Sequence, residues 1–250
     1  VRRMPAVEAL GSCTMIATDK TGTLTLNELT VTDIVLPGGS RFECETGSEI
    51  DACRILGDTG HDLSANDRVS RLFKAASMPN EGALIRDENG WAGVGDTVDV
   101  ALLAAARKAG LEHQALAEHY PLLTRIPYEP DLKYAASFHQ RGDVVRVFAK
   151  GSPETLIGMA DRMDMGTEFV PIDRDALLRQ KEEMAARGLR VLALADGEIS
   201  SGENSDLGAH HLVDLVFLGM VGMQDPVRPE VPQAVADGRS AGVGIAMVTG

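Results

Sequence analysis

The run from Asp19 to Thr25, which reads DKTGTLT, constrains this chain more than any other segment. It follows a short stretch rich in apolar and β-branched residues, 13–18, which predicts a buried strand with Asp19 at its carboxyl end. Ligands bind at that end of the strands in an open α/β sheet. A carboxylate there can attack a phosphoryl group and become an aspartyl phosphate. The alternative interpretation is an ordinary strand followed by a polar turn.

The run resembles the phosphorylation motif of P-type cation-transporting ATPases, which belong to the haloacid-dehalogenase-like superfamily. The resemblance implies that Asp19 is the nucleophile, that Lys20, Thr21 and Thr23 surround the phosphate, and that Asp19 and the carbonyl of Thr21 hold Mg²⁺. Many hydrolases of the superfamily carry a second Asp two places after the nucleophile, where this chain has Thr21. The replacement favours a persistent phosphoenzyme over a simple phosphatase.

The composition narrows the class of protein further. The 250 residues contain 37 acidic and 24 basic side chains, giving a formal charge of −13. This excess of acids offers no basic stripe for nucleic acid, so no nucleic-acid partner is expected. The odd number of cysteines, without a C-x-x-C pair, fits a reducing compartment better than a disulfide framework (Cys13, Cys44 and Cys53).

Apolar runs in the chain are too short to cross a membrane as helices, which need about 18 apolar residues or more. The longest candidate, 212–223, is interrupted by Asp214. From the first residues, VRR, we expect no signal peptide, and the chain stops at Gly250, where the strand predicted at 243–249 reaches its functional end. We therefore expect it to be a piece of a larger protein, and a pump of the family would need a membrane domain outside this sequence.

Periodicity and turn residues predict the order of the elements. Helices are expected at 66–77, 96–109, 153–159, 174–187 and 229–241, and strands at 122–127, 134–139, 144–150, 189–195, 215–223 and 243–249. The middle of this pattern is antiparallel α+β, whereas the ends are strand–helix–strand pieces. We therefore predict an α/β chain in which an inserted domain, residues 33–213, interrupts a second domain made of 1–32 and 214–250. The resemblance implies that the insert is a nucleotide-binding domain and the rest a partial, Rossmann-like phosphorylation domain.

A lysine and a glycine at the end of a predicted strand open the next helix, in the run KGSPE from Lys150 to Glu154. Backbone N–H groups at a helix start favour anions, and glycine allows a ligand to approach closely. The run resembles the KGAPE motif of the same ATPases, with Ser152 in place of Ala. This implies nucleotide contacts by Lys150 and Gly151. The ordinary alternative is a strand–turn–helix connection with a surface lysine.

The segment IPYEPDLKY, 126–134, resembles the PF-x-S-x-x-K segment in which an aromatic ring stacks on adenine. Tyr128 takes the aromatic position and Lys133 the lysine position. A flat ring can stack on a purine at little entropic cost. The chain departs from the pattern at Pro130 and Ala135. The alternative is a core tyrosine before a proline-rich turn.

Three further motifs follow in the order of the family. The run GLRVLALA, 188–195, resembles a strand of the calcium-pump-like branch, which implies that Arg190 reaches the nucleotide phosphates. The run GDTVDVAL, 95–102, resembles the family's GDPTE-x-AL helix start, which implies an acid near adenine at Asp99. The segment DPVRPE resembles DPPR-x-E and implies hinge or nucleotide contacts by Asp225 and Arg228. Ordinary alternatives remain open. Core packing with a solvated arginine would explain GLRVLALA, and a turn at a helix start would explain DPVRPE.

The last two residues, Thr249 and Gly250, match the beginning of the family's TGD motif and are expected at the catalytic site. No spacing of histidines with Cys or carboxylates indicates a further metal site. All motifs together resemble the cytoplasmic ATP-binding and phosphorylation region of a P-type pump of the calcium-pump-like branch.

The resemblance implies ATP and Mg²⁺ as cofactors, and ATP/ADP and a transported cation as partners. It also implies contacts with membrane and actuator domains of the same pump, at the cytoplasmic side of a plasma or inner membrane. Domain closure would bring the nucleotide to Asp19. Two other hypotheses remain open at this point. One is a soluble haloacid-dehalogenase-like phosphatase, and the other is a nucleotide-binding module without turnover.

Overall fold

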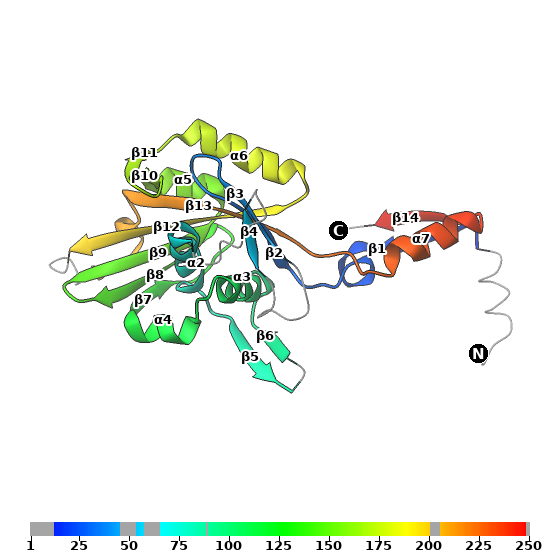
Figure 1. Ribbon diagram of the computed structural model, residues 1–250, viewed down its shortest axis with the longest axis horizontal. Coiled ribbons are helices and arrows are strands. Elements are labelled where there is room, and N and C mark those ends of the chain that lie inside the picture. The colour runs from blue at the N-terminus through cyan, green and yellow to red at the C-terminus, as the bar shows by residue number, and fades with distance from the viewer. Residues whose placement is uncertain (1–12, 46–53, 58–65, 89, 201–205, 249–250) are drawn as a thin grey trace. The chain divides into compact units, whose positions relative to one another are not determined.

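The computed structural model describes residues 13–45, 54–57, 66–88, 90–200 and 206–248 (Figure 1). The chain divides into two compact units. The larger unit is Thr30–Gln224, and the smaller unit joins Val1–Leu29 to Asp225–Gly250. The larger unit is therefore inserted into the smaller one; it begins 3 residues before and ends 11 residues after the predicted 33–213.

The larger unit is built on one sheet of ten described strands, with the main order β4-β3-β2-β13-β12-β9-β8-β7. Every neighbouring pair along this order is antiparallel. β10 runs parallel to β13, and β11 pairs with β10. The strands are β2 (Thr30–Val35), β3 (Arg41–Cys44), β4 (Ile55–Gly57), β7 (Leu122–Ile126), β8 (Tyr134–Arg141), β9 (Val144–Gly151), β10 (Ala160–Asp164), β11 (Phe169–Pro171), β12 (Arg190–Ser200) and β13 (Leu215–Gln224). The mainly antiparallel pattern predicted for the middle of the chain is confirmed.

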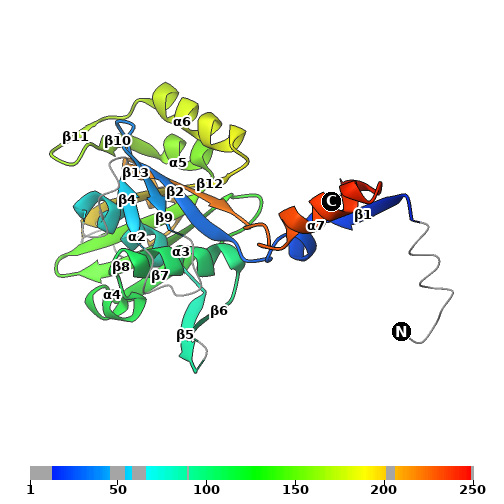
Figure 2. The ribbon, with the colours of Figure 1, turned by 45° about the vertical axis from the view of Figure 1, so that its right-hand side comes forward.

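Helices cover both faces of this sheet (Figures 1 and 2). On one side lie α2 (Asp67–Ser77), α3 (Thr97–Lys108) and α4 (His113–His119); on the other lie α5 (Pro153–Met159) and α6 (Arg174–Ala186). Alternate residues of β9 face opposite layers. Val147 and Ala149 join the apolar core with Leu156 and Leu177 of α5 and α6, whereas Phe148 meets Tyr120 edge to face beside α4.

Side-chain caps explain where two of these helices begin. Asn66 accepts hydrogen bonds from the backbone N–H groups of Arg68 and Val69 at the start of α2. Asp96 accepts one from Val98 at the start of α3. Such caps satisfy donors that have no partner within the helix. The predicted starts of both helices are confirmed within a residue.

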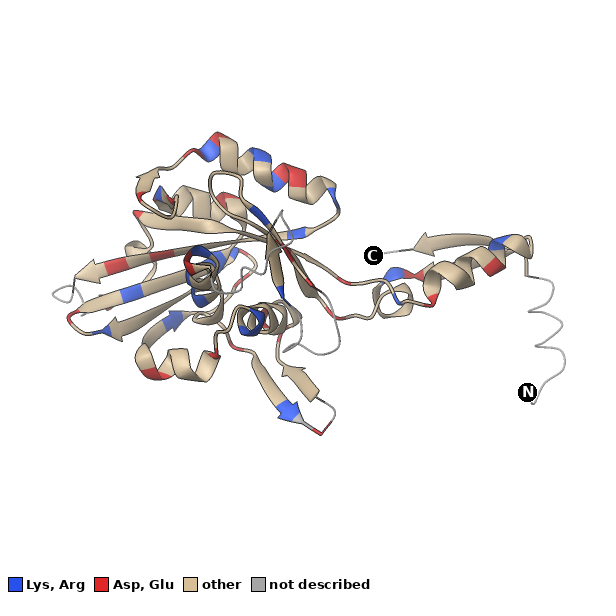
Figure 3. Cartoon of the chain, in the orientation of Figure 1, with Lys and Arg blue, Asp and Glu red and all other residues tan. Residues whose placement is uncertain are grey.

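α6 carries charges of both signs along its length (Figure 3). Its Lys181 bridges to Glu154 of α5 at 3.1 Å, while Leu177 and Met184 are buried against the sheet. One stripe of this helix is therefore core and the rest faces solvent.

Three local structures were not expected from the sequence. They are the hairpin of β5 (Ala83–Asp87) and β6 (Gly90–Val94), the short helix α4, and the β10–β11 pair. β12 also continues to Ser200, beyond the end of the strand predicted at 189–195. The hairpin and α4 are too short to give a clear periodicity.

One assignment of a strand to a domain is wrong. The strand at 215–223 was predicted to belong to the terminal domain, but β13 lies in the larger unit, between β12 and β2. Nine of its ten residues are buried. An uninterrupted apolar run predicts a buried strand but does not say which sheet contains it.

The smaller unit contains β1 (Met15–Asp19), the irregular turn η1 (Lys20–Leu24), α7 (Val231–Ser240) and β14 (Gly244–Val248). β1 and β14 are parallel, with Asp19 opposite Val248. β1 was predicted to be buried, but Met15 is 64% exposed and Ile16 46%. The described sheet of this unit has two strands, and so small a sheet cannot bury both faces.

No helix in the described part of the chain is long and apolar enough to cross a membrane. The described residues also hold no group of three or more His, Cys, Asp or Glu side chains arranged to bind a metal.

Candidate functional site

A small pocket in the larger unit brings together three of the predicted nucleotide-site residues, Asp99, Tyr128 and Lys150. Its volume is about 30 Å³. The lining residues come from the end of α2, the start of α3, the end of β7 and strands β8 and β9: Met78, Pro79, Glu81, Asp99, Arg125, Ile126, Pro127, Tyr128, Ala135, Ala136 and Lys150. Residues up to 72 positions apart in the sequence therefore meet at one place.

The ammonium of Lys150 lies at the end of β9 and forms a buried ion pair with the Asp99 carboxylate. Burial lowers the pKa of Lys150 below its ordinary value of 10.5, and the charge of Asp99 opposes that shift. A buried cation needs such a partner, because its desolvation would otherwise be uncompensated. The pair keeps a positive charge at the base of the pocket, next to the space that a ligand would enter.

Asp99 also fixes the loop that follows α2. Its Oδ2 accepts a hydrogen bond from the backbone N–H of Glu81 at 2.9 Å. Its carbonyl accepts another from Asn80 Nδ2 at 2.9 Å, and Asn80 Oδ1 accepts one from the N–H of Gly82 at 2.7 Å. The first turn of α3 and the loop 79–82 therefore form one hydrogen-bonded wall of the pocket.

Gly151 is required by a close backbone approach. A Cβ atom at this position would lie 2.6 Å from the carbonyl oxygen of Lys133 and 2.9 Å from the Cα of Tyr134. The same Lys133 oxygen accepts a hydrogen bond from the N–H of Ser152 at 2.9 Å. Lys133 adopts a left-handed backbone conformation, with φ of 60°. The predicted pair Lys133 and Gly151 thus meets through the backbone, although neither lines the pocket.

Tyr128 is 55% exposed, so its ring is available at the mouth of the pocket. This excludes the alternative of a core tyrosine. The ring follows β7 through Pro127, whose fixed φ limits how the segment can move.

Arg190 does not line the pocket. It is exposed at the first residue of β12, three positions before Ala193, which pairs with Gly151. Its predicted phosphate contact stays a prediction.

Two pocket residues, Glu81 and Arg125, were not predicted. They form an ion pair across the mouth, with 3.6 Å between Arg125 Nη1 and Glu81 Oε1. Their charge was the only signal in the sequence. The two residues meet through the pairing of β7 with β8 and through the loop after α2, and neither contact can be read from neighbouring residues.

The predicted phosphorylation site lies in the smaller unit. Asp19 ends β1, and its Oδ1 accepts a hydrogen bond from the N–H of Lys20 at 2.7 Å. Gly22 takes φ of 76°, which turns the chain, and its N–H donates to Thr25 Oγ1 at 3.2 Å. The side chains of Thr21 and Thr23 are exposed. Asp19 is therefore presented at a strand end, beside a tight polar turn.

The chemistry of this donor set fits Mg²⁺. The ion prefers hard oxygen ligands, such as the carboxylate of Asp19 and a backbone carbonyl like that of Thr21. Among the described residues, the only hydrogen bond to the Asp19 side chain comes from Lys20, so its second oxygen is open to a ligand.

Asp225 and Arg228 hold this turn in place. Asp225 Oδ2 accepts a hydrogen bond from Thr25 Oγ1 at 2.5 Å, and Asp225 Oδ1 accepts one from the N–H of Glu28 at 3.1 Å. Arg228 Nη2 donates to the carbonyl of Gly22 at 3.2 Å. The contacts seen for both residues are thus with the segment after Asp19. Two other predicted catalytic residues, Thr249 and Gly250, lie outside the described residues.

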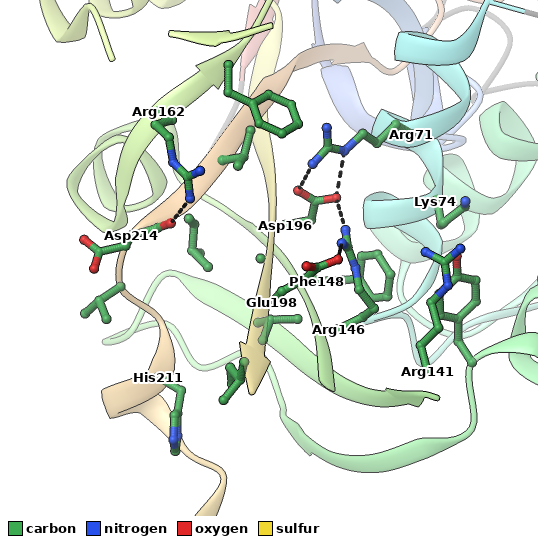
Figure 4. A pocket seen from close by; sticks show the side chains of 18 of the residues that line it. Arg71, Lys74, Arg141, Arg146, Phe148, Arg162, Asp196, Glu198, His211 and Asp214 are labelled. Atoms are coloured by element: carbon green, nitrogen blue, oxygen red, sulfur yellow. Dashed lines mark hydrogen bonds and ion pairs between the residues drawn. The ribbon is translucent and has the colours of Figure 1, made fainter. Parts of the chain in front are cut away.

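A second cavity of the larger unit, about 1030 Å³, lies elsewhere, and none of the predicted nucleotide residues is among the residues that line it. At its wall, Asp196 is 1% exposed and accepts hydrogen bonds from Arg71 and Arg146 (Figure 4). Arg146 also pairs with Glu198. This network links α2 to β9 and β12, and most of its charge is internally compensated.

Comparison with known proteins agrees with the motifs. The family described as "P-type ATPase, cytoplasmic domain N" matches residues 68–230. The chain is 37% identical over its whole length to the cation-transporting ATPase pma1 of Synechocystis, covering 28% of that protein. It is 37% identical to the probable cation-transporting ATPase F of Mycobacterium tuberculosis and 34% identical to the mouse calcium-transporting ATPase type 2C member 1, again over the whole chain.

The chain spans 28% of the first two of these relatives and 26% of the mouse protein. The match covers the helices and strands that build the small pocket, from α2 through β9 to the end of β13. The chain therefore belongs to the P-type cation-transporting ATPase family, and residues 68–230 match its cytoplasmic domain N.

Proposed function

We propose that the larger unit binds ATP at the pocket formed by Asp99, Tyr128 and Lys150. The observation that carries the proposal is the convergence of these three motif residues at one pocket. The exposed ring of Tyr128 offers a stacking surface for adenine. Lys150 offers a point charge for phosphate. Lys133 and Gly151 support the end of β9 through their close backbone approach, and Arg190 is the further candidate for a phosphate contact.

We further propose that the smaller unit is part of a haloacid-dehalogenase-like phosphorylation domain in which Asp19 accepts the γ-phosphoryl group. The Asp19 carboxylate attacks phosphorus, the bond to ADP breaks, and an aspartyl phosphate forms. Lys20, Thr21 and Thr23 stabilise the charge that develops on the phosphoryl oxygens. Asp19 and the Thr21 carbonyl would hold Mg²⁺, which supplies further neutralisation of this charge. Thr21 provides no carboxylate to activate water, which supports a lasting intermediate.

In the whole protein, the proposal couples this chemistry to the transport of a cation across a membrane, with this chain on the cytoplasmic side. Relatives named as cation- and calcium-transporting ATPases support this class of activity. The membrane and actuator domains of such a pump would be the partners of this chain.

A nucleotide titration tests the binding step. We expect ATP to shift amide resonances around the pocket of the wild-type chain, and Tyr128→Ala to weaken binding by about 1–3 kcal/mol, the scale of a lost stacking contact. Lys150→Ala should weaken ATP more than adenosine, because it removes a phosphate partner. Lys181→Ala, on α6, is the matched control. Wild-type affinity in both Tyr128→Ala and Lys150→Ala would refute the site.

A further inference from the structure

Glu81 and Arg125 place a hydrogen-bond acceptor and a donor side by side at the pocket mouth. Arg125 Nη1 and Glu81 Oε1 are 3.6 Å apart, and both residues line the pocket together with Tyr128 and Lys150. The two side chains are 47% and 57% exposed, so their polar edges remain open to a ligand. A guanidinium has five N–H donors and a carboxylate about four acceptor positions, so each group can bind a ligand while the pair persists.

The other acidic residue of the pocket is already engaged. Asp99 gives one oxygen to Lys150 and the other to the backbone N–H of Glu81. Glu81 is therefore the pocket carboxylate whose oxygens are most free to accept from a bound molecule. Its charge also acts on Lys150, raising the pKa of that ammonium against the effect of burial.

Both groups are held by ordered parts of the fold. The backbone of Glu81 is fixed by Asp99, and its neighbour Asn80 is buried and hydrogen-bonded. Arg125 lies on β7, where it is paired with Ser137 of β8. Binding groups on rigid supports discriminate between ligands because they cannot easily rearrange for the wrong one.

The position of the stacking ring favours recognition of an edge. Tyr128 is 55% exposed and lines the pocket together with Glu81 and Arg125. A base stacked on this ring would therefore lie at the mouth of the pocket and present one polar edge toward Glu81 and Arg125.

We propose that the Glu81–Arg125 pair selects adenine by reading this edge, which rests on the proposed binding of ATP. Adenine carries an amino donor at its 6-position beside a ring-nitrogen acceptor, matching the carboxylate of Glu81 and the guanidinium of Arg125. A 6-oxo purine has an acceptor in place of the amino donor. With the ring held on Tyr128 and the phosphates on Lys150, the base cannot turn over to restore the match, and unpaired polar groups penalise it.

The test compares dissociation constants of ATP and ITP, since ITP differs at the 6-position without adding the 2-amino group of guanine. We expect the wild-type chain to prefer ATP, and Glu81→Ala and Arg125→Ala each to reduce the ATP/ITP ratio about fivefold, the low end for a bidentate base contact. The double change Glu81→Arg with Arg125→Glu keeps an ion pair but reverses its polarity, and it should shift the preference toward ITP.

The corresponding swap of the exposed pair Arg41 and Glu183 is the control and should leave the ratio unchanged. Urea unfolding of each variant identifies any loss of fold. If ATP binds through Tyr128 and Lys150 but the ratio is the same in the wild type, Glu81→Ala and the double variant, this proposal is wrong while the proposed function stands. If ATP does not bind in a Tyr128- and Lys150-dependent way, the proposed function itself fails.

Discussion

The ammonium of Lys150, at the end of β9, is bound by the carboxylate of Asp99, 51 positions earlier in the first turn of α3. The side chains are only 7% and 13% exposed. This pair connects the sheet to the helical layer and leaves Lys150 partly neutralised before a ligand arrives. A phosphate group would therefore compete with Asp99 for the ammonium. Affinity at this pocket should depend on how strongly Asp99 holds its partner.

The protonation of Lys150 gives a pH-dependent prediction. Its pKa in the folded chain is lower than in the unfolded chain, because burial disfavours the charged form. Between the two pKa values the unfolded chain binds more protons, so the free energy of unfolding should rise with pH up to about 10.5. Asp99→Asn removes the main opposing influence. We expect it to lower the pKa of Lys150 further. As the pH rises, ATP binding should then weaken at a lower pH than it does in the wild type.

Nuclear magnetic resonance of the lysine side chain measures this pKa directly. Glu154→Gln, which alters the ion pair of Lys181 on α5 and α6, is the control and should leave Lys150 unchanged. An equal Lys150 pKa in wild type and Asp99→Asn would show that the ion pair does not govern its charge.

Gly151→Ala should destabilise the larger unit. The new Cβ would meet backbone atoms of Lys133 and Tyr134 at 2.6–2.9 Å, and these cannot move without disturbing β8. Overpacking of this kind costs about 1–3 kcal/mol. Gly158→Ala, on an open surface of α5, is the matched control and should gain roughly 0.5–1 kcal/mol, because glycine is unfavourable in a helix. Urea unfolding compares the two, and equal stabilities would contradict the close approach.

Local signals in the sequence were sufficient for most elements of the larger unit. Asn66 and Asp96 were recognised as helix starts because a cap acts on donors two or three residues away. The four residues left between the strands predicted at 134–139 and 144–150 contain the turn between β8 and β9, with Gly142 at φ of 58°. Such features depend on neighbours in the chain, so one sequence is enough to predict them.

Features set by distant contacts could not be predicted in the same way. Glu81 and Arg125 are ordinary surface charges in the sequence, and they meet because the loop after α2 is fixed by Asp99 and because β7 pairs with β8. The placement of β13 also depends on pairing, since its apolar run suits any buried strand. Motif resemblance located Tyr128 and Lys150, but it did not show that the space between them is small.

Asp196→Ala tests the charge network beside the cavity of about 1030 Å³. Asp196 is buried and accepts from Arg71 at 2.7 and 2.9 Å and from Arg146 at 2.7 Å. Removing it leaves two guanidinium groups with less compensation, and loss of one partner of a buried pair costs about 3–5 kcal/mol. We expect the low end of that range, because Arg71 is a quarter exposed. Glu183→Ala breaks an exposed pair and should cost about 0–1 kcal/mol. A loss below that of Glu183→Ala would contradict a stabilising role for Asp196.

The proposed chemistry makes its sharpest prediction at Asp19. In a full-length protein carrying this chain, Asp19→Asn should abolish acid-stable incorporation of label from the γ-phosphate of ATP, because an amide is a very poor nucleophile. The substitution keeps the shape of the side chain and an oxygen that can accept from the N–H of Lys20, so the turn should persist. ATP affinity should stay unchanged, since Tyr128 and Lys150 are untouched.

Asp237→Asn, on α7 of the same unit, is the control and should still form phosphoenzyme. Incorporation of label by the Asp19→Asn protein would show that a residue other than Asp19 is phosphorylated. Loss of incorporation in both variants would instead indicate damage to the fold of the smaller unit.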